Sequence, residues 1–205
     1  ISWKNKGVLT STNPAQCTSI SPNSIDYIFT DPPFGANIMY SELNFIWESW
    51  LKVFTENALE AIENRTQRKS TLVYQGIMLK CFKEYFRILK PGKWMTVEFS
   101  NTSAAVWNGI RAAIQTAGFV ICDITDINKT HGGIRAYAYH AAVKQDLAIT
   151  CYKSSSEFDL KFKQNKNFEI GVWQLTEEHL CHLPIHLSKG NSTNAIIERS
   201  PKILF

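Results

Sequence analysis

The sequence predicts an α/β protein whose helices cover the faces of a layered sheet. Two observations support this class: strand-type apolar runs alternate with longer segments whose apolar residues have helical spacing, and the last two strand-type runs are joined by a loop without a helix. With 205 residues, 44% of them hydrophobic, the chain is long enough to bury one sizeable core. We therefore expect a sheet that ends in an antiparallel strand pair.

The first half of the chain is expected to hold two strands and two helices. The stretch "GVLTSTNPAQ" predicts a first strand, and "SPNSIDYIFTDPP" predicts a turn and a short buried strand. A helix is expected over "SELNFIWESWL", with Ser41 placed to cap it, and a longer helix from Tyr74 to Leu89 that stops at "KPGK". Between the helices, "ENRTQRKS" is expected to be a solvated loop, with a phosphate contact as the alternative.

The second half alternates strand, helix, strand and strand. "WMTVEFSN" predicts a strand, "SAAVWNGIRAAIQTAG" a helix closed by Gly118, and "FVICDITDI" a further strand. After a loop rich in glycine and aromatic residues, "DLAITCYK" is the last clear strand. From about Ser154 the chain becomes polar, so residues 1–153 are expected to form the main domain and 154–205 an extension or the start of a further segment.

Charge and cysteine content narrow the class of protein. The net charge of +4 is mildly basic and fits a polyanionic partner. The five cysteines are scattered without a C-x-x-C pair, which disfavours a disulfide framework, and Pro184 interrupts the set His179, Cys181, His182 and His186, which disfavours a zinc site. No metal is expected. Without a signal peptide or a run of about 18 apolar residues, the protein is expected to be soluble and cytoplasmic, with no membrane partner.

The stretch "TDPPFG" at residues 30–35 is the most informative motif. Two prolines stop a β-ladder and stiffen the chain where a strand ends. An Asp-Pro-Pro-aromatic sequence arises by chance about once in 100,000 positions. In open α/β sheets, ligands bind beyond the carboxyl ends of the strands, so a binding loop is expected here, with a plain structural turn as the alternative.

"TDPPF" after a strand resembles motif IV of the amino-methyltransferases, which transfer a methyl group from S-adenosylmethionine to exocyclic nitrogens of adenine or cytosine in DNA. "DPPFGANIMYSELNFIWESWL" resembles a group of bacterial DNA methylases, and "YFRILKPGK" with the closing strand pair is similar to the second half of the class I methyltransferase fold. The resemblance covers about Gly7 to Lys153. It implies a Rossmann-like class I sheet, S-adenosylmethionine as cofactor, DNA as partner, and methylation of adenine N6 ahead of cytosine N4.

The resemblance implies catalytic roles for Asp31, Pro32, Pro33 and Phe34. An exocyclic amine is a poor nucleophile because its lone pair is delocalised into the ring, and acceptors on both N–H groups favour the pyramidal, reactive form. The Asp31 carboxylate and the Pro32 carbonyl are expected to be those acceptors, held by the stiff Pro32-Pro33 pair. Phe34 is expected to stack on a base that has left the duplex.

Further substrate-binding candidates are weaker. Gly35 and Asn37 would line the same loop, while Tyr40 would face the base or begin the helix core. Ser100 and Asn101 end the next strand beside the loop, although capping of the following helix by Asn101 or Ser103 is favoured over a binding role. His131 and Arg135 lie in the loop "NKTHGGIRAYAYH" and would contact DNA, unless that loop only turns the chain.

The cofactor half of the resembled enzymes is missing from the sequence. The ten glycines contain no Gly-x-Gly, and only thirty residues precede Asp31. The fold is therefore expected to be incomplete on its N-terminal side, with the cofactor half upstream of Ile1 or, in a permuted enzyme, downstream of Phe205. The isolated chain should then bind the cofactor poorly and methylate nothing. Its open strand edge along "DYIFT" should pair with a second copy, as a homodimer, or with residues 7–13.

Two other functions fit the same residues. An RNA guanine-N2 methyltransferase is one, because some tRNA-modifying enzymes also carry an aromatic residue and glycine after Asp-Pro-Pro at a strand end. A catalytically inactive nucleic-acid-binding domain of the same fold is the other. An upstream RNA-binding module would favour the former, and a lack of cofactor binding by the full-length protein would favour the latter.

Overall fold

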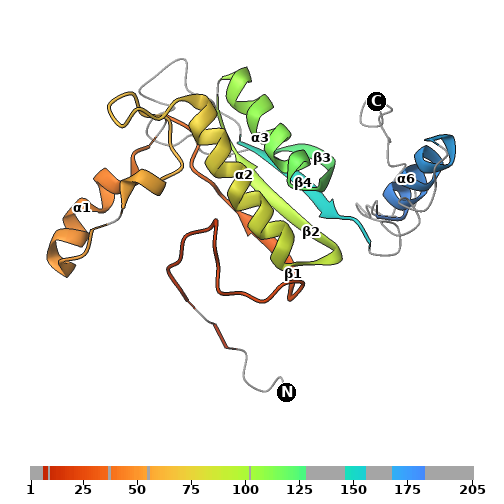
Figure 1. The fold of residues 1–205 in the computed structure, drawn as a ribbon, viewed down its shortest axis with the longest axis horizontal. Coiled ribbons are helices and arrows are strands. Elements are labelled where there is room, and N and C mark those ends of the chain that lie inside the picture. Colours follow the sequence, from red (N-terminus) through yellow and green to blue (C-terminus); the bar gives the residue numbers. More distant parts are fainter. Residues whose placement is uncertain are drawn as a thin grey trace, which may run out of the picture.

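The structure is a computed structural model that describes residues 7–8, 10–36, 38–54, 56–101, 103–127, 146–155 and 168–182. Its helices and strands follow one another in the order shown in Figure 1: β1 (Ile25–Thr30), α1 (Tyr40–Leu51), a 3-10 turn (Asn57–Leu59), α2 (Thr71–Ile88), β2 (Leu89–Phe99), α3 (Ala104–Thr116), β3 (Phe119–Ile127), β4 (Asp146–Lys153) and α6 (Phe168–His182).

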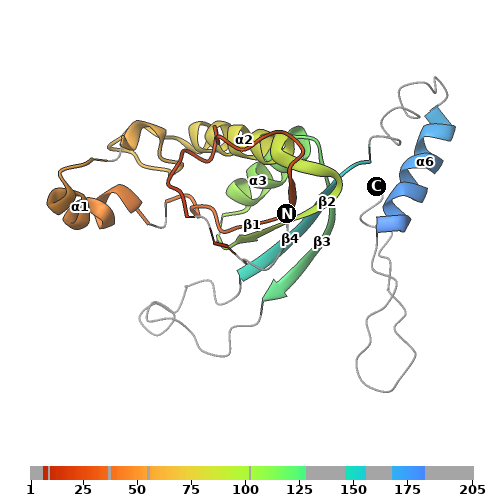
Figure 2. The same cartoon turned by 90° about the horizontal axis from the view of Figure 1, so that it is seen from below.

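The four strands form one mixed sheet in the order β1-β2-β4-β3. β1 and β2 are parallel, whereas β4 runs antiparallel to both of its neighbours, β2 and β3. Helices α2 and α3 lie side by side over one face of this sheet (Figures 1 and 2). The predicted fold class, a layered α/β sheet with an antiparallel final strand pair, is confirmed.

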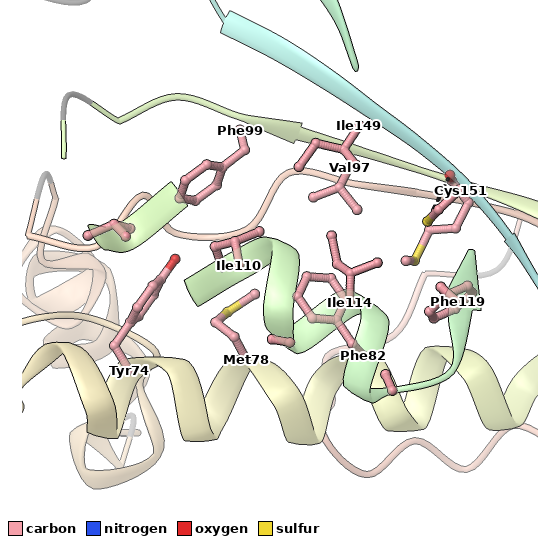
Figure 3. Packing of buried hydrophobic residues seen from close by; sticks show 14 of the residues in the cluster. Tyr74, Met78, Phe82, Val97, Phe99, Ile110, Ile114, Phe119, Ile149 and Cys151 are labelled. Carbon is pink, nitrogen blue, oxygen red and sulfur yellow. Dashed lines mark hydrogen bonds between the residues drawn. The ribbon is translucent and has the colours of Figure 1, made fainter. Parts of the chain in front are cut away.

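The core lies between the sheet and the helix pair, as Figure 3 shows. Along β2, the buried residues Met95, Val97 and Phe99 alternate with half-buried ones, as expected for a strand with one covered face. The helices contribute side chains at helical spacing, among them Tyr74, Met78, Phe82, Ile110 and Ile114. These periodicities explain why α2, α3, β3 and β4 form where the sequence predicted them.

The predicted first strand is wrong, because no strand forms in the described residues before β1. The segment bonds to the end of α2 instead. The Asn23 N–H donates to the Arg87 carbonyl over 2.9 Å. The Ser24 N–H donates to the Ile88 carbonyl over 2.8 Å. The last carbonyl groups of a helix have no hydrogen-bond partners within the helix. This segment supplies such partners at the end of α2 instead of pairing with the sheet.

A buried carboxylate anchors the same segment. Glu84 accepts hydrogen bonds from the Thr18 N–H and hydroxyl, over 2.8 and 2.7 Å, and pairs with Arg87 over 2.7 Å. The Arg87 guanidinium and then the Thr18 donors hold the pKa of the Glu84 carboxyl at about 2, below its ordinary value of 4.5. A depressed pKa stabilises the fold above the unfolded-state value, and this contribution is lost as the pH falls through the folded-state value.

Glu84→Gln is therefore expected to lower the free energy of unfolding at pH 7 by about 1–3 kcal/mol. The difference from wild type should narrow as the pH falls from about 5 towards about 2, because the wild-type carboxylate then becomes protonated. Urea titrations at a series of pH values measure this, with the exposed Glu177→Gln as a control that changes stability little. A difference that does not vary with pH would contradict the assignment.

Helix α1 forms where the sequence predicted a helix, but Ser41 is not its N-cap. The cap position is Met39, and Ser41 lies in the first turn, where its N–H and hydroxyl donate to the Glu60 carboxylate over 3.0 and 2.7 Å. A carboxylate at this end stabilises the helix. No side chain of α1 is buried, and Trp47 and Trp50 are 71% and 84% exposed. The helix extends away from the sheet in Figures 1 and 2.

β1 is an edge strand whose one sheet neighbour, within the residues described, is β2. Its side chains Tyr27 and Phe29 are 54% and 59% exposed. The expectation that residues 7–13 pair with this edge is wrong, since those of them that the structure describes form no strand. A homodimer through the edge stays a prediction.

The segment after residue 154 contains α6, a helix that was not expected. It contacts the end of the sheet: the Glu178 carboxylate accepts a hydrogen bond from the Ser155 N–H over 3.0 Å, and His179 Nδ1 lies 3.4 Å from the Tyr152 hydroxyl. The domain boundary at Ser154 stays a prediction. Across the described ranges, no helix has the length and hydrophobicity needed to cross a bilayer.

Candidate functional site

The loop Asp31–Gly35 leaves the carboxyl end of β1, and Ser100 and Asn101 follow the carboxyl end of β2. Because these strands are parallel neighbours, with Thr30 opposite Val97, both segments emerge at the same edge of the sheet. A direct contact joins them: Asn101 Nδ2 donates to the Phe34 carbonyl over 2.7 Å. Most of the sequence-predicted loop residues therefore lie together at this edge.

Three successive carbonyl groups of the loop accept hydrogen bonds from three different segments. The buried Tyr74 hydroxyl of α2 donates to the Pro33 carbonyl over 2.6 Å. Asn101 donates to the Phe34 carbonyl, and the Glu63 N–H donates to the Gly35 carbonyl over 3.2 Å. The structure shows no hydrogen bond from a described residue to the Pro32 carbonyl. That acceptor belongs to Pro32, which is buried, and it follows the exposed Asp31.

Asn101 makes hydrogen bonds both to the loop after β1 and to the start of α3. Its Oδ1 accepts a hydrogen bond from the Ser103 N–H over 2.7 Å, which stabilises the start of α3, where the Ser103 side chain itself makes no capping bond. Its Nδ2 reaches the loop, and its carbonyl accepts from Trp107 Nε1 over 2.7 Å. The N-cap position of α3 is Ser103, so Asn101 is not the cap residue; its side chain instead bonds to the backbone of Ser103 and to the loop. A substrate-binding role for Asn101 stays a prediction. Ser100 beside it is half-buried.

Phe34 begins a row of three aromatic rings that leads from the loop into the core. Its ring packs edge-to-face on Phe99, with centroids 5.3 Å apart and an angle of 83°. Phe99 packs in the same way on Trp107, at 5.0 Å and 87°. Phe34 is half-buried, so part of its ring is covered by the core and part remains exposed.

Tyr40 begins α1 and lies within electrostatic range of Asp31. Partial burial raises the pKa of the Tyr40 hydroxyl, and the negative charges of Asp31 and Glu60 raise it further. Burial likewise raises the pKa of Tyr74, with a smaller effect from the Glu63 carboxylate. Both tyrosines are therefore protonated at neutral pH and can donate hydrogen bonds.

Residues 60–69 support the site, although sequence reasoning did not include them. Lys69 is only 7% exposed, and its ammonium group donates to the carbonyls of Asn57 and Glu60, so the expectation of a solvated loop is wrong at this position. Glu63 Oε1 is buried and has no hydrogen-bond partner in the described structure. No local pattern marks these residues, or Tyr74, as neighbours of the loop, because their contacts depend on the tertiary fold.

Two features of position 35 favour glycine: its backbone conformation and the lack of room for a side chain. Its φ of +76° lies in the left-handed region, and a Cβ built there would lie 3.2 Å from Asn101 Nδ2 and 3.7 Å from the Glu63 carboxylate. A side chain at this position would press on the contact between Asn101 and the loop.

Gly35→Ala is therefore expected to lower the free energy of unfolding by about 1–2 kcal/mol. The matched control is Gly76→Ala, because Gly76 lies inside α2 with no atom within 4 Å of the added Cβ. That change should stabilise the protein by about 0.5–1 kcal/mol. Urea unfolding of both variants measures the two effects. If both substitutions changed the free energy of unfolding in the same direction, the requirement for glycine at position 35 would be contradicted.

The remaining residues singled out in the sequence lie, wholly or in their side chains, outside the part of the chain that the structure describes. Asn37, His131 and Arg135 lie outside the described residues, as do the side chains of Cys181, His182 and His186. Within the part of the chain that the structure describes, no group of three or more His, Cys, Asp and Glu side chains gathers as a metal site would require.

Comparisons with known proteins give remote similarities. No protein-family model matches the chain, and no curated protein matches it. A candidate DNA modification methylase of Thermus thermophilus is 13% identical over 70% of this chain and 53% of its own, with a TM-score of 0.42. The cytosine-N4-specific DNA methyltransferase PvuII is 14% identical over 66% and 45%, with a TM-score of 0.44. The cyclase SpnF is 14% identical over 71% and 57%, with a TM-score of 0.40.

The chain thus spans roughly half the length of each of these solved structures.

Proposed function

We propose that this chain is the catalytic half of a DNA methyltransferase that transfers a methyl group from S-adenosylmethionine to an exocyclic amine of an extruded base, adenine N6 ahead of cytosine N4. In this proposal Asp31 and the Pro32 carbonyl accept the two N–H groups of the amine, and Phe34 stacks on the base. Gly35, Asn37, Tyr40 and Ser100 border the base, while His131 and Arg135 contact DNA.

One observation supports this proposal most directly. The carbonyl groups of Pro33, Phe34 and Gly35 are occupied by hydrogen bonds, whereas no described residue bonds to that of Pro32, which adjoins an exposed carboxylate. A neutral and an anionic acceptor at a stiff strand end suit a primary amine that becomes cationic as it is methylated. Preorganised acceptors of this kind lower the barrier where positive charge develops.

The described residues do not by themselves account for binding of the cofactor. None of them forms a glycine-rich turn after a strand, which is the feature that lets a backbone approach such a ligand. When bound, S-adenosylmethionine would supply the electrophilic methyl group. The part played by this chain is to orient the amine, to stabilise its developing charge at Asp31, and to hold the base at Phe34.

The test uses the whole protein with labelled S-adenosylmethionine and separate pools of DNA and RNA. Label in DNA that digestion assigns to N6-methyladenine or N4-methylcytosine would support the proposal. Label confined to RNA guanine would favour an RNA guanine-N2 methyltransferase. Binding of DNA without cofactor binding or methyl transfer would favour an inactive nucleic-acid-binding domain.

A further inference from the structure

We infer that Tyr74 and Asn101 are positioning residues, which together fix the loop after β1 so that the Pro32 carbonyl keeps a constant direction beside Asp31. This inference rests on the proposed function, because it assigns to the two side chains a part in orienting the amine. Neither side chain is proposed to touch the substrate. They act through the peptide groups that follow Pro32.

The geometry of the loop explains why two contacts are enough. Tyr74 holds the Pro33 carbonyl over 2.6 Å, and Asn101 holds the Phe34 carbonyl over 2.7 Å. Each contact fixes the direction of one peptide plane. Proline rings restrict the dihedral angles of residues 32 and 33, so once the following two carbonyl groups are fixed, little freedom is left for the Pro32 carbonyl.

The two donors come from different layers of the fold. Tyr74 is fully buried, and its ring points from α2 towards the sheet (Figure 3), whereas Asn101 lies two residues after the end of β2. The loop is therefore tied to the rigid core on one side and to the neighbouring strand on the other. Catalysis by positioning is lost when groups move by about 1 Å. These two hydrogen bonds are therefore expected to affect the rate of methyl transfer as well as stability.

Asn101 offers a substitution that separates its two contacts. Asn101→Asp keeps an oxygen to accept the Ser103 N–H, so this contact before the start of α3 is retained. It replaces the donor Nδ2 by an oxygen that faces the Phe34 carbonyl, so the contact with the loop becomes repulsive. Tyr74→Phe in the same way keeps the buried ring and removes only the donor to the Pro33 carbonyl.

Matched controls reproduce the chemical change away from the loop. Tyr152→Phe removes another hydroxyl from a fully buried tyrosine, one that lies near His179. Asn108→Asp adds the same negative charge at an exposed position of α3. These controls show what loss of a buried hydroxyl or addition of one charge does by itself.

The first measurement is amide hydrogen exchange of the 205-residue chain, read at Glu63, whose N–H donates to the Gly35 carbonyl of the loop. Tyr74→Phe and Asn101→Asp should speed exchange there by about tenfold or more, because opening of the loop then loses one of its ties. Tyr152→Phe and Asn108→Asp should leave it unchanged. The Trp107 indole N–H resonance should shift in Asn101→Asp, since that indole donates to the Asn101 carbonyl.

The second measurement is steady-state methyl transfer by the whole protein. Both variants should lower kcat by about 10- to 100-fold with KM for the nucleic acid within about threefold, and the double variant should lose less than the product of the single losses. Loop exchange or kcat no different from the controls would overturn the inference. If the wild-type protein transfers no methyl group, the proposed function fails, whereas the exchange measurement still decides whether these residues fix the loop.

Discussion

Replacement of Asp31 by alanine is expected to lower the rate of methyl transfer by the whole protein about 100- to 1000-fold. Asp31 follows β1 directly and is exposed, so its carboxylate can meet an amine that enters from solvent or DNA. The loss falls on the chemical step, because the carboxylate interacts most strongly with the nitrogen as it becomes cationic. Single-turnover kinetics with labelled cofactor measure this step, and affinity for the cofactor should change little.

Two further variants sharpen this prediction. Asp31→Asn should retain more activity than Asp31→Ala, because its amide oxygen still accepts one N–H. Asp26→Ala is the matched control on the same strand: Asp26 is exposed and pairs with Lys90 over 2.8 Å, a surface contact of small value. The activity of Asp26→Ala should stay within about twofold of that of wild type. If Asp31→Ala were as active as Asp26→Ala, the assignment of Asp31 as an acceptor would fail.

Phe34→Ala is expected to weaken productive binding of DNA by about 1–3 kcal/mol. The ring is half-buried against Phe99, so one part of the side chain packs in the core and the remainder can stack on a base. Phe34→Tyr and Phe34→Trp should keep most of the activity. The loss should be smaller on a mismatched or single-stranded target, for which less unstacking energy has to be offset.

Phe34→Leu distinguishes stacking from packing, because leucine keeps apolar volume against Phe99 but offers no aromatic face. Stacking predicts that Phe34→Leu resembles Phe34→Ala in activity and wild type in stability. A fluorescent base analogue at the target position reports extrusion of the base directly. Equal losses on paired and mismatched DNA, with unchanged analogue fluorescence in Phe34→Ala, would show that Phe34 only completes the core.

Much of the fold followed from the sequence because its signals are local. The helical spacing in α2 and α3 and the apolar runs of β3 and β4 depend on residues a few positions apart, which is the range over which periodicity carries information. The predicted first strand failed because the residues before β1 meet the unpaired carbonyl groups of α2 through long-range contacts. The cap at Ser41 failed in the same way, since Glu60 takes that role from a distant segment.

The site was predictable to the extent that one rule of sheet geometry applies. The carboxyl ends of neighbouring parallel strands meet, and this places Asn101 beside Phe34. The contact of Tyr74 with Pro33 was not predictable, because Tyr74 reads as one more apolar position of a core helix. Glu63 was missed for a similar reason, since its N–H reaches Gly35 from a stretch whose sequence suggests a solvated loop.

A structure of the whole protein with S-adenosylhomocysteine and a DNA duplex containing the target base tests the central claim most directly. The target base should be extruded against Phe34, with its exocyclic nitrogen about 2.7–3.2 Å from both the Asp31 carboxylate and the Pro32 carbonyl. A base held elsewhere, with its amine out of hydrogen-bond reach of Asp31 and Pro32, would contradict it.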